Sequence, residues 1–297
     1  MSARDPRELF ALDRRAVARA FDRASNGYDA AAALQERVRT ELFGRLDELD
    51  VAPRALLDLG AGTGHSTRAL KRRYPKALVV AADIAGGMLE QARHQSRWLR
   101  RFERVRADAY TLPFRDASFE LVFSSLMLQW CDDLDMVFAE IARVLAPGGL
   151  LLFSTFGPGT LAELRECWTA SGAPGNHVNH FFDPHALGSA LMHARLAEPV
   201  LDVDRIVIGY QDVRALMREL KAIGAHNVTR GRARGLTGRQ RLAAMTRAYE
   251  TLRRDGRLPA TYEVIHASSW GPERRASDAF PRETVIPASS IRRRETK

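Results

Sequence analysis

The stretch Leu56-Leu57-Asp58-Leu59-Gly60-Ala61-Gly62-Thr63-Gly64-His65 decides the fold of this chain. A short apolar run ends there in three alternating glycines, and a helical pattern begins directly after them. Glycine has no Cβ, so the turn can bend sharply and its backbone can approach a ligand closely. Open α/β sheets bind ligands at such turns, outside the carboxyl ends of their strands. The stretch therefore predicts a strand, a ligand-binding loop and a helix.

The spacing of these glycines excludes two common nucleotide-binding loops. A dinucleotide fingerprint requires G-x-G-x-x-G, whereas this loop reads G-x-G-x-G and continues with His65. A P-loop requires Gly-Lys-Ser/Thr, and no lysine follows Gly64. The loop thus lacks a phosphate grip, and Asp58 places a carboxylate just before the glycines. This combination suits a ligand with a cationic end.

Strand and helix patterns alternate on both sides of the loop. Apolar runs typical of strands lie at 55–59, 77–82, 105–107, 119–124 and 150–156. Helical patterns lie at 66–74, 86–98 and 134–145. Strands separated by helices form βαβ units, so these segments predict a parallel sheet.

The chain divides into four segments on these patterns. Two amphipathic helical series, interrupted by Ser25-Asn26-Gly27, predict an N-terminal helical lid over 1–50. The cofactor-binding core spans 51–157, and irregular helices with further strands over 158–271 predict a substrate lid that also completes the sheet. The polar, proline-containing segment 272–297 is expected to be a disordered tail.

Acidic residues stand at the ends of three consecutive strands. Asp83 ends the second strand, where an acid can accept hydrogen bonds from both ribose hydroxyls. Met88 follows by about one helical turn and can pack on a purine, and Asp108-Ala109 can meet an exocyclic amine. Any one aspartate could instead cap a helix. Together with Asp58, they describe a site for S-adenosylmethionine better than one for a phosphorylated nucleotide.

With these residues the chain resembles the class I S-adenosylmethionine-dependent methyltransferases over about residues 12–155. The resemblance implies an α/β, Rossmann-like sheet of seven strands, mostly parallel with the last strand antiparallel, with N-terminal helices and an inserted helical lid. It implies S-adenosyl-L-methionine as methyl donor, S-adenosyl-L-homocysteine as product and no metal. The residues expected to bind the cofactor are Asp58, Gly60, Gly62, Gly64, Asp83, Met88, Asp108, Ala109 and Ser124.

A narrower resemblance covers almost the whole chain except its first ten residues and its tail. It is to members of this family that methylate the free carboxylate of a malonyl thioester on acyl-carrier protein or coenzyme A, a step toward biotin. A methyltransferase for another small carboxylate or metabolite, or a methyltransferase-fold hydroxylase or assembly factor, remains an alternative. The motifs that carry the resemblance include Phe21-Asp22-Arg23-Ala24, Leu128-Gln129-Trp130-Cys131, Leu220-Lys221-Ala222-Ile223-Gly224 and Pro259-Ala260-Thr261-Tyr262.

This chemistry would need no general base. A malonyl carboxyl should titrate near an aspartate, at about 4, so it is already an anionic nucleophile at neutral pH. The protein would hold oxygen, methyl carbon and sulfur in line within a dry site. The side chains expected to orient the substrate are Tyr28, Trp130, Phe156, His180 and Lys221.

Positive charge is concentrated in one part of the chain. The net charge is +9, and residues 205–254 contain 12 basic and 3 acidic side chains, so the remainder is neutral. Arg214, Arg218 and Lys221 share one helix face. We expect them, with Arg232 and Arg239, to dock an acidic acyl-carrier protein.

Other partners are not expected. Nucleic-acid amino-methyltransferases commonly carry an Asn/Asp-Pro-Pro-aromatic motif after the fourth strand, and this chain reads Ser124-Ser125-Leu126-Met127 there. No apolar run approaches the roughly 20 residues that a membrane span needs. The two cysteines, Cys131 and Cys167, form no ligand-spaced pair. We therefore expect a cytoplasmic protein without a metal.

Overall fold

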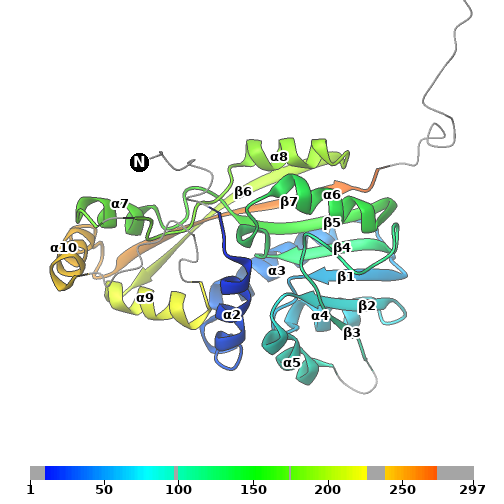
Figure 1. The fold of residues 1–297 in the computed structure, drawn as a ribbon, viewed down its shortest axis with the longest axis horizontal. Coiled ribbons are helices and arrows are strands. Elements are labelled where there is room, and N and C mark those ends of the chain that lie inside the picture. Colours follow the sequence, from blue (N-terminus) through cyan, green and yellow to red (C-terminus); the bar gives the residue numbers. More distant parts are fainter. Residues whose placement is uncertain (1–10, 97–99, 174, 226–237, 273–297) are drawn as a thin grey trace, which may run out of the picture.

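The computed structural model describes residues 11–96, 100–173, 175–225 and 238–272 (Figure 1). Most of the segment expected to be a tail and residue Arg232 lie outside these ranges. The described strands are β1 (Ala55–Leu59), β2 (Leu78–Asp83), β3 (Glu103–Arg106), β4 (Phe119–Ser125), β5 (Leu145–Phe156), β6 (Ala197–Tyr210) and β7 (Leu258–Trp270).

These strands form one seven-stranded sheet in the order β3-β2-β1-β4-β5-β7-β6. Neighbours from β3 to β5 pair in parallel. Strand β7 is inserted between β5 and β6 and pairs antiparallel with both. The predicted mostly parallel sheet with an antiparallel last strand is therefore confirmed. Its crossover helices must cover both faces.

The described α-helices are α2 (Arg14–Ala24), α3 (Ala33–Asp47), α4 (His65–Arg73), α5 (Gly86–Gln95), α6 (Leu134–Val144), α7 (Ala162–Ala170), α8 (Pro184–His193), α9 (Val213–Ala222) and α10 (Arg239–Glu250). Several begin after an aspartate whose carboxylate accepts a backbone N–H two or three residues into the first turn. These capping residues are Asp13, Asp133, Asp183 and Asp212. None of the described helices is long and apolar enough to cross a membrane.

Alternate side chains of the strands enter two separate cores. Leu57, Val122 and Phe153 pack with α6 and α8 on one face. Their neighbours Leu56 and Phe123 pack with α3, α4 and α5 on the other face. The result is a three-layer α/β/α arrangement, because a buried parallel strand is apolar on both sides.

A third core lies where β6 and β7 extend beyond the other strands. There α7, α9 and α10 gather at one end of the molecule (Figure 1). Their apolar side chains pack with those of β6 and β7, including the buried Tyr249 and Tyr262. The helix α2 lies beside α5, and the Gly87 N–H donates a hydrogen bond to the Asp22 carboxylate at 2.7 Å. The N-terminal segment and this third core thus flank the carboxyl ends of the parallel strands (Figure 1).

Candidate active site

The glycine loop follows β1 as the sequence predicts, and its backbone requires glycine. Gly60, Gly62 and Gly64 have φ values of 75°, 54° and 83°, a region that other L-residues rarely adopt. A Cβ on Gly60 would lie 2.3 Å from Met127 Cγ, and one on Gly64 would lie 2.8 Å from Ala92 Cβ. Gly60 and Gly64 are therefore required for close packing as well as for their positive φ. A Cβ on Gly62 would meet no atom within 4 Å, so only its positive φ favours glycine there.

Asp83 connects this loop to the next crossover. Its Oδ2 accepts the Gly62 N–H at 2.9 Å, and its Oδ1 accepts the Ala85 N–H at 2.8 Å. Burial is the largest cause that raises the pKa of Asp83, to about 6, against the lowering effect of these two N–H groups. Each oxygen has a second lone pair, so the carboxylate can still accept from a ligand's hydroxyls.

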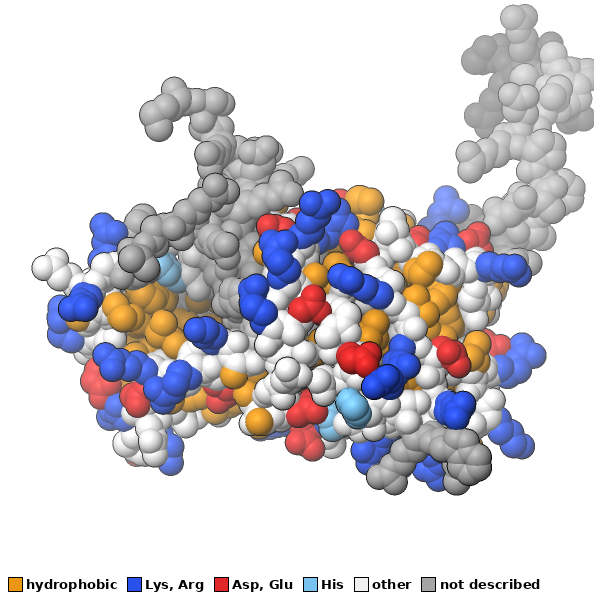
Figure 2. All heavy atoms as spheres, turned by 60° about the horizontal axis from the view of Figure 1, so that its bottom comes forward, with side chains coloured by type: hydrophobic (Ala, Val, Ile, Leu, Met, Phe, Trp, Pro, Cys, Tyr) orange, Lys and Arg blue, Asp and Glu red, His pale blue; other side chains and the backbone are white. Residues whose placement is uncertain are grey.

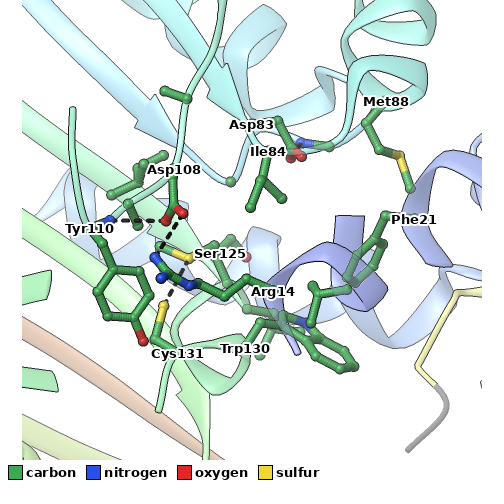
Figure 3. A pocket seen from close by; sticks show the side chains of 18 of the residues that line it. Arg14, Phe21, Asp83, Ile84, Met88, Asp108, Tyr110, Ser125, Trp130 and Cys131 are labelled. Carbon is green, nitrogen blue, oxygen red and sulfur yellow. Dashed lines mark hydrogen bonds and ion pairs between the residues drawn. The ribbon is translucent and has the colours of Figure 1, made fainter. Parts of the chain in front are cut away.

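A cavity of about 750 Å³ opens at the carboxyl ends of β1, β2 and β4. Figure 3 shows Asp83 and Ile84 on one side of it, Met88 and Phe21 on another, and Trp130 and Cys131 across from them. Its wall is mostly apolar, and the carboxylates of Asp83 and Asp108 are part of it. The residues expected to bind the cofactor that line it are Gly60, Gly62, Asp83, Met88, Asp108 and Ala109.

Arg14, which the sequence did not single out, closes one side of this cavity. Its Nη1 lies 3.0 Å from Asp108 Oδ2, and its guanidinium stacks over the Tyr110 ring at 4.6 Å from the centroid (Figure 3). Asp108 Oδ1 accepts the Tyr110 N–H at 3.1 Å. Arg14 belongs to α2, about ninety residues away in sequence, so no local pattern could pair it with Asp108.

Two residues expected at the cofactor face the interior instead. Asp58 is 1% exposed and accepts a hydrogen bond from the Thr67 hydroxyl beneath the loop. Burial raises the pKa of Asp58 to about 7. Ser124 donates to the Leu59 carbonyl at 2.8 Å inside the sheet, and the next residue, Ser125, lines the cavity. Successive residues of a strand point to opposite faces of the sheet, so Ser125 lines the cavity and the expected Ser124 does not.

A second cavity, of about 730 Å³, lies beside the first. The two share Phe21, Tyr28, Leu126 and Trp130 as lining residues. Phe21 and Trp130 meet edge to face with ring centroids 5.2 Å apart. Two expected substrate-orienting residues, Tyr28 and Trp130, therefore lie in the wall between the cavities.

The far side of the second cavity is aromatic with a few polar groups. The ring of Phe156, the third expected residue there, lies 5.8 Å from that of Phe181 and 5.9 Å from that of Tyr262. The polar side chains are Gln35, Gln129, Thr160, His177 and Asn179. Gln35 lies on α3, a helix whose sequence signal is its apolar stripe, so no local pattern marked this residue as part of a site.

His180 and Lys221 do not line this second cavity. Asn179 is 8% exposed and lines the cavity, whereas His180 is exposed and lines a separate surface hollow with Asp132 and His193. On α9, Leu220 lines the cavity and the adjacent Lys221 is exposed. In both cases the residue directly before the expected one, Asn179 or Leu220, lines the cavity instead. Adjacent side chains point in different directions, so a shift of one residue decides which of the two faces the cavity.

The exposed face of α9 carries Arg214, Arg218 and Lys221. Within the described ranges, none of these three side chains pairs with an acidic residue. Arg239 is exposed at the start of α10. Figure 2 shows Lys and Arg side chains around an apolar area at the end of the molecule where α7, α9 and α10 gather.

The sheet order, the glycine loop and the acids at the strand ends define a class I, S-adenosylmethionine-dependent methyltransferase. The family profile described as "Methyltransferase domain" matches residues 57–153. The YcgJ protein of Bacillus subtilis has the same fold, with a TM-score of 0.56 and 18% identity over 78% of this chain and 98% of that one. So does phosphoethanolamine N-methyltransferase 2 of Haemonchus contortus in complex with S-adenosyl-L-methionine (TM-score 0.52, 16% identity, 85% of this chain and 57% of that one).

Curated relatives are much more similar in sequence. Malonyl-[acyl-carrier protein] O-methyltransferase of Methylovorus sp. strain MP688 is 48% identical over 91% of this chain and 93% of its own length. The protein of that name from Halorhodospira halophila is 45% identical over 98% of this chain and 99% of its own length. The chain belongs to the malonyl-[acyl-carrier protein] O-methyltransferase family.

Proposed function

We propose that this protein transfers the methyl group of S-adenosylmethionine to the free carboxylate of a malonyl thioester on an acyl-carrier protein, in the synthesis of biotin. The observation that carries the proposal is the pair of adjoining cavities with Tyr28 and Trp130 in their common wall. Asp83, which we assign to the cofactor ribose, lines the first cavity, and we assign the second, mostly apolar cavity to the acyl group. The names of the close relatives support the same substrate.

In this proposal the cofactor lies across the ends of β1, β2 and the segment after β3. Asp83 accepts hydrogen bonds from the ribose hydroxyls, and Met88 packs on the adenine. Asp108, with Ala109 beside it, accepts a hydrogen bond from the adenine amine. The sulfonium points toward the wall shared with the second cavity. Asp58 acts indirectly, because it holds Thr67 and the loop from beneath.

The reaction is a displacement at carbon that moves no proton. A carboxylate oxygen forms a bond to the methyl carbon, the carbon–sulfur bond breaks, and its electron pair stays on sulfur as a neutral thioether. The anion and the sulfonium neutralise each other in the transition state, so a site that excludes water favours the reaction. The aromatic side chains of Phe21, Trp130 and Phe156 supply that environment.

Polar groups in the second cavity can hold the substrate. The side-chain oxygens of Gln35 and Asn179 are buried and have no hydrogen-bond partner in the described part of the chain. As amides they can accept from the amides of a pantetheine arm or, turned over, donate to the malonyl carboxylate. Burial and the nearby Asp83 and Asp29 raise the pKa of Tyr28, so its phenol stays protonated and can donate as well.

The α9 surface offers a place for the carrier protein. Leu220 and Ile223 line the second cavity from the end of α9, while Arg214, Arg218 and Lys221 face solvent on the same element. An acidic carrier bound there would have its arm close to the cavity. We assign Arg239 to the same surface and place the reaction in the cytoplasm, where the free, buried Cys131 and Cys167 stay reduced.

The reaction is tested with methyl-labelled S-adenosylmethionine and malonyl-acyl-carrier protein, followed by mild base. A methyl ester releases its label as methanol, whereas N-methyl and C-methyl products keep it. Label that stays on the acyl group after base would contradict carboxyl methylation. A purified protein that binds the cofactor and transfers no label would favour a hydroxylase or an assembly factor.

Charge reversal tests the docking surface. The Arg214→Glu/Arg218→Glu variant should raise KM about tenfold or more for malonyl-acyl-carrier protein, because like charges would then face each other. It should leave KM for a short malonyl thioester unchanged. Arg72→Glu/Lys76→Glu makes the same change in net charge on the exposed surface near α4 and serves as the control. Equal losses on both substrates would refute docking at α9.

A further inference from the structure

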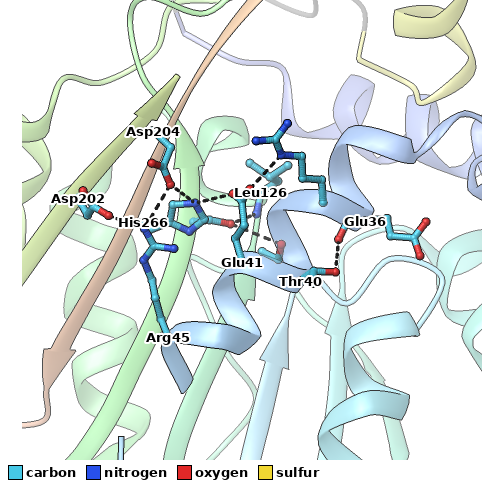
Figure 4. A network of polar contacts seen from close by, with 11 residues as sticks. Glu36, Thr40, Glu41, Arg45, Leu126, Asp202, Asp204 and His266 are labelled. Atoms are coloured by element: carbon cyan, nitrogen blue, oxygen red, sulfur yellow. Dashed lines mark hydrogen bonds and ion pairs between the residues drawn. The ribbon is translucent and has the colours of Figure 1, made fainter. Parts of the chain in front are cut away.

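A buried histidine meets two carboxylates, and none of the three residues lines either cavity (Figure 4). His266 lies on β7, Asp204 on the adjacent β6 and Glu41 on α3. One ligand atom from each residue lies within 4.8 Å of the other two. We propose that Glu41, Asp204 and His266 bind a divalent transition-metal ion such as zinc.

The two nitrogen–oxygen distances fit a shared ion better than a hydrogen bond. His266 Nε2 lies 3.6 Å from Glu41 Oε2 and 3.5 Å from Asp204 Oδ2. Hydrogen bonds between such atoms are usually below about 3.2 Å. Two ligands that are each about 2.0–2.1 Å from a tetrahedral zinc ion lie roughly 3.3 Å apart. A small movement of the side chains would therefore complete the site.

Two of the three atoms that would bind the ion have no hydrogen-bond partner among the described residues. The His266 side chain is fully buried, and neither ring nitrogen has a hydrogen-bond partner among the described residues. Glu41 Oε2 is also buried without such a partner, whereas Glu41 Oε1 accepts from Arg37 Nε at 2.9 Å. Buried polar atoms without partners are costly, and a bound cation would give His266 Nε2 and Glu41 Oε2 a partner at once.

Metal binding requires the imidazole of His266 to be neutral and the two carboxylates to be ionised. Arg45 pairs with Asp202, and its Nη2 also lies 3.2 Å from Asp204 Oδ2, the oxygen that faces His266, so it helps to hold the Asp204 carboxylate in place (Figure 4). Carboxylate and imidazole are both common zinc ligands, and a water molecule can fill the fourth position.

An ion here would connect α3 to the sheet. The side chains come from the N-terminal segment and from the two last strands, and the ion would add to the Arg45 ion pairs that already join α3 to β6. Since α3 also carries Gln35 into the second cavity, the ion would stabilise the position of that helix. The expected effect is on the stability of the fold, with no part in methyl transfer.

Titration of the full chain with zinc chloride, after treatment with a chelator, tests the site. We expect one bound ion by calorimetry and a higher melting temperature with zinc than without it. Glu41→Gln and His266→Gln should each weaken binding by more than about tenfold, since even the loss of an outer-shell partner costs that much. Both variants should also lose the thermal shift.

The controls separate this site from other zinc-binding groups. His193→Gln removes an exposed histidine that lies 3.1 Å from Asp135, a pair without a third ligand, and should leave zinc binding unchanged. Cobalt(II) should give visible bands without thiolate charge transfer. If His266→Gln does not fold, Glu41→Gln decides, because the Glu41 side chain is 28% exposed whereas that of His266 is fully buried. Unchanged zinc affinity in Glu41→Gln, or no binding by the wild type, would overturn the proposal.

Discussion

The proposed contact between Asp83 and the cofactor ribose makes a quantitative prediction for the Asp83→Asn variant. Asparagine has nearly the same shape but keeps one acceptor oxygen, and its amide N–H groups would oppose the N–H of Gly62 or Ala85. Hydrogen bonds to a charged group contribute about 1.5–3 kcal/mol each. Losing one of them should weaken binding of S-adenosylmethionine by roughly 10–150-fold, since 1.4 kcal/mol corresponds to a factor of ten.

The same carboxylate makes this affinity depend on pH. The pKa of Asp83 is raised to about 6, so protons compete with the ribose hydroxyls for it below that pH. Wild-type affinity should therefore be constant above about pH 7 and fall by up to about tenfold per pH unit below about pH 6. The asparagine variant has no group to titrate at this position, so its weaker affinity should change less with pH.

Calorimetric titration with S-adenosylmethionine at several pH values measures both effects. Asp116→Asn removes a carboxylate that pairs with Arg143 outside the cavity, and it should bind like the wild type. Circular dichroism and melting temperature verify that each variant is folded. Undiminished affinity in folded Asp83→Asn would refute the assignment of Asp83 and, with it, the position of the cofactor.

Four further variants test the loop and the second cavity. Asp58→Asn should raise the free energy of unfolding by roughly 2–4 kcal/mol at about pH 8 and much less near pH 4. Burial raises the pKa of Asp58 to about 7, so the buried carboxylate destabilises the folded protein only where it is ionised. Thermal unfolding that shows no pH-dependent gain in stability would contradict this. Gly64→Ala should lose about 1–3 kcal/mol of stability in denaturant unfolding, since its φ is positive and a Cβ would lie 2.8 Å from a neighbouring side chain, whereas Gly44→Ala, which has open space, should not. Gln35→Ala and Asn179→Ala should each raise KM for the malonyl thioester several-fold and leave the affinity for the cofactor unchanged. A loss of cofactor affinity with an unchanged KM for the thioester would contradict their assignment to the substrate cavity.

The fold could be predicted because its signals are local. Strand and helix periods and the alternating glycines each lie within a few residues, and the strand ends can then be placed by the βαβ rule. For the same reason Asp83, Met88 and Asp108 were found at the first cavity, since each lies at or shortly after the end of its strand. Trp130 was found through a motif of the family resemblance, and Tyr28 because it is an aromatic residue with a polar tip that directly follows the break at Ser25-Asn26-Gly27.

Some of the expected site residues do not line the expected cavity, and the orientation of their side chains is the reason. Ser124 and Ser125, or Asn179 and His180, are adjacent in sequence and offer similar chemistry. Which of the two faces a cavity depends on how the backbone enters the next turn, and that is fixed by packing against distant elements. Asp58 has the expected position, but the packing of α4 and Thr67 turns its carboxylate beneath the loop.

Contacts between distant segments appear only in the folded chain. Arg14 reaches Asp108 across 94 residues, and Glu41, Asp204 and His266 gather from three segments with no ligand spacing among them. Local sequence determines which elements form and which residues stand at the end of each strand, because those preferences act over one or two turns. The pairing of side chains across elements depends instead on how the whole core packs, so only the three-dimensional arrangement reveals it.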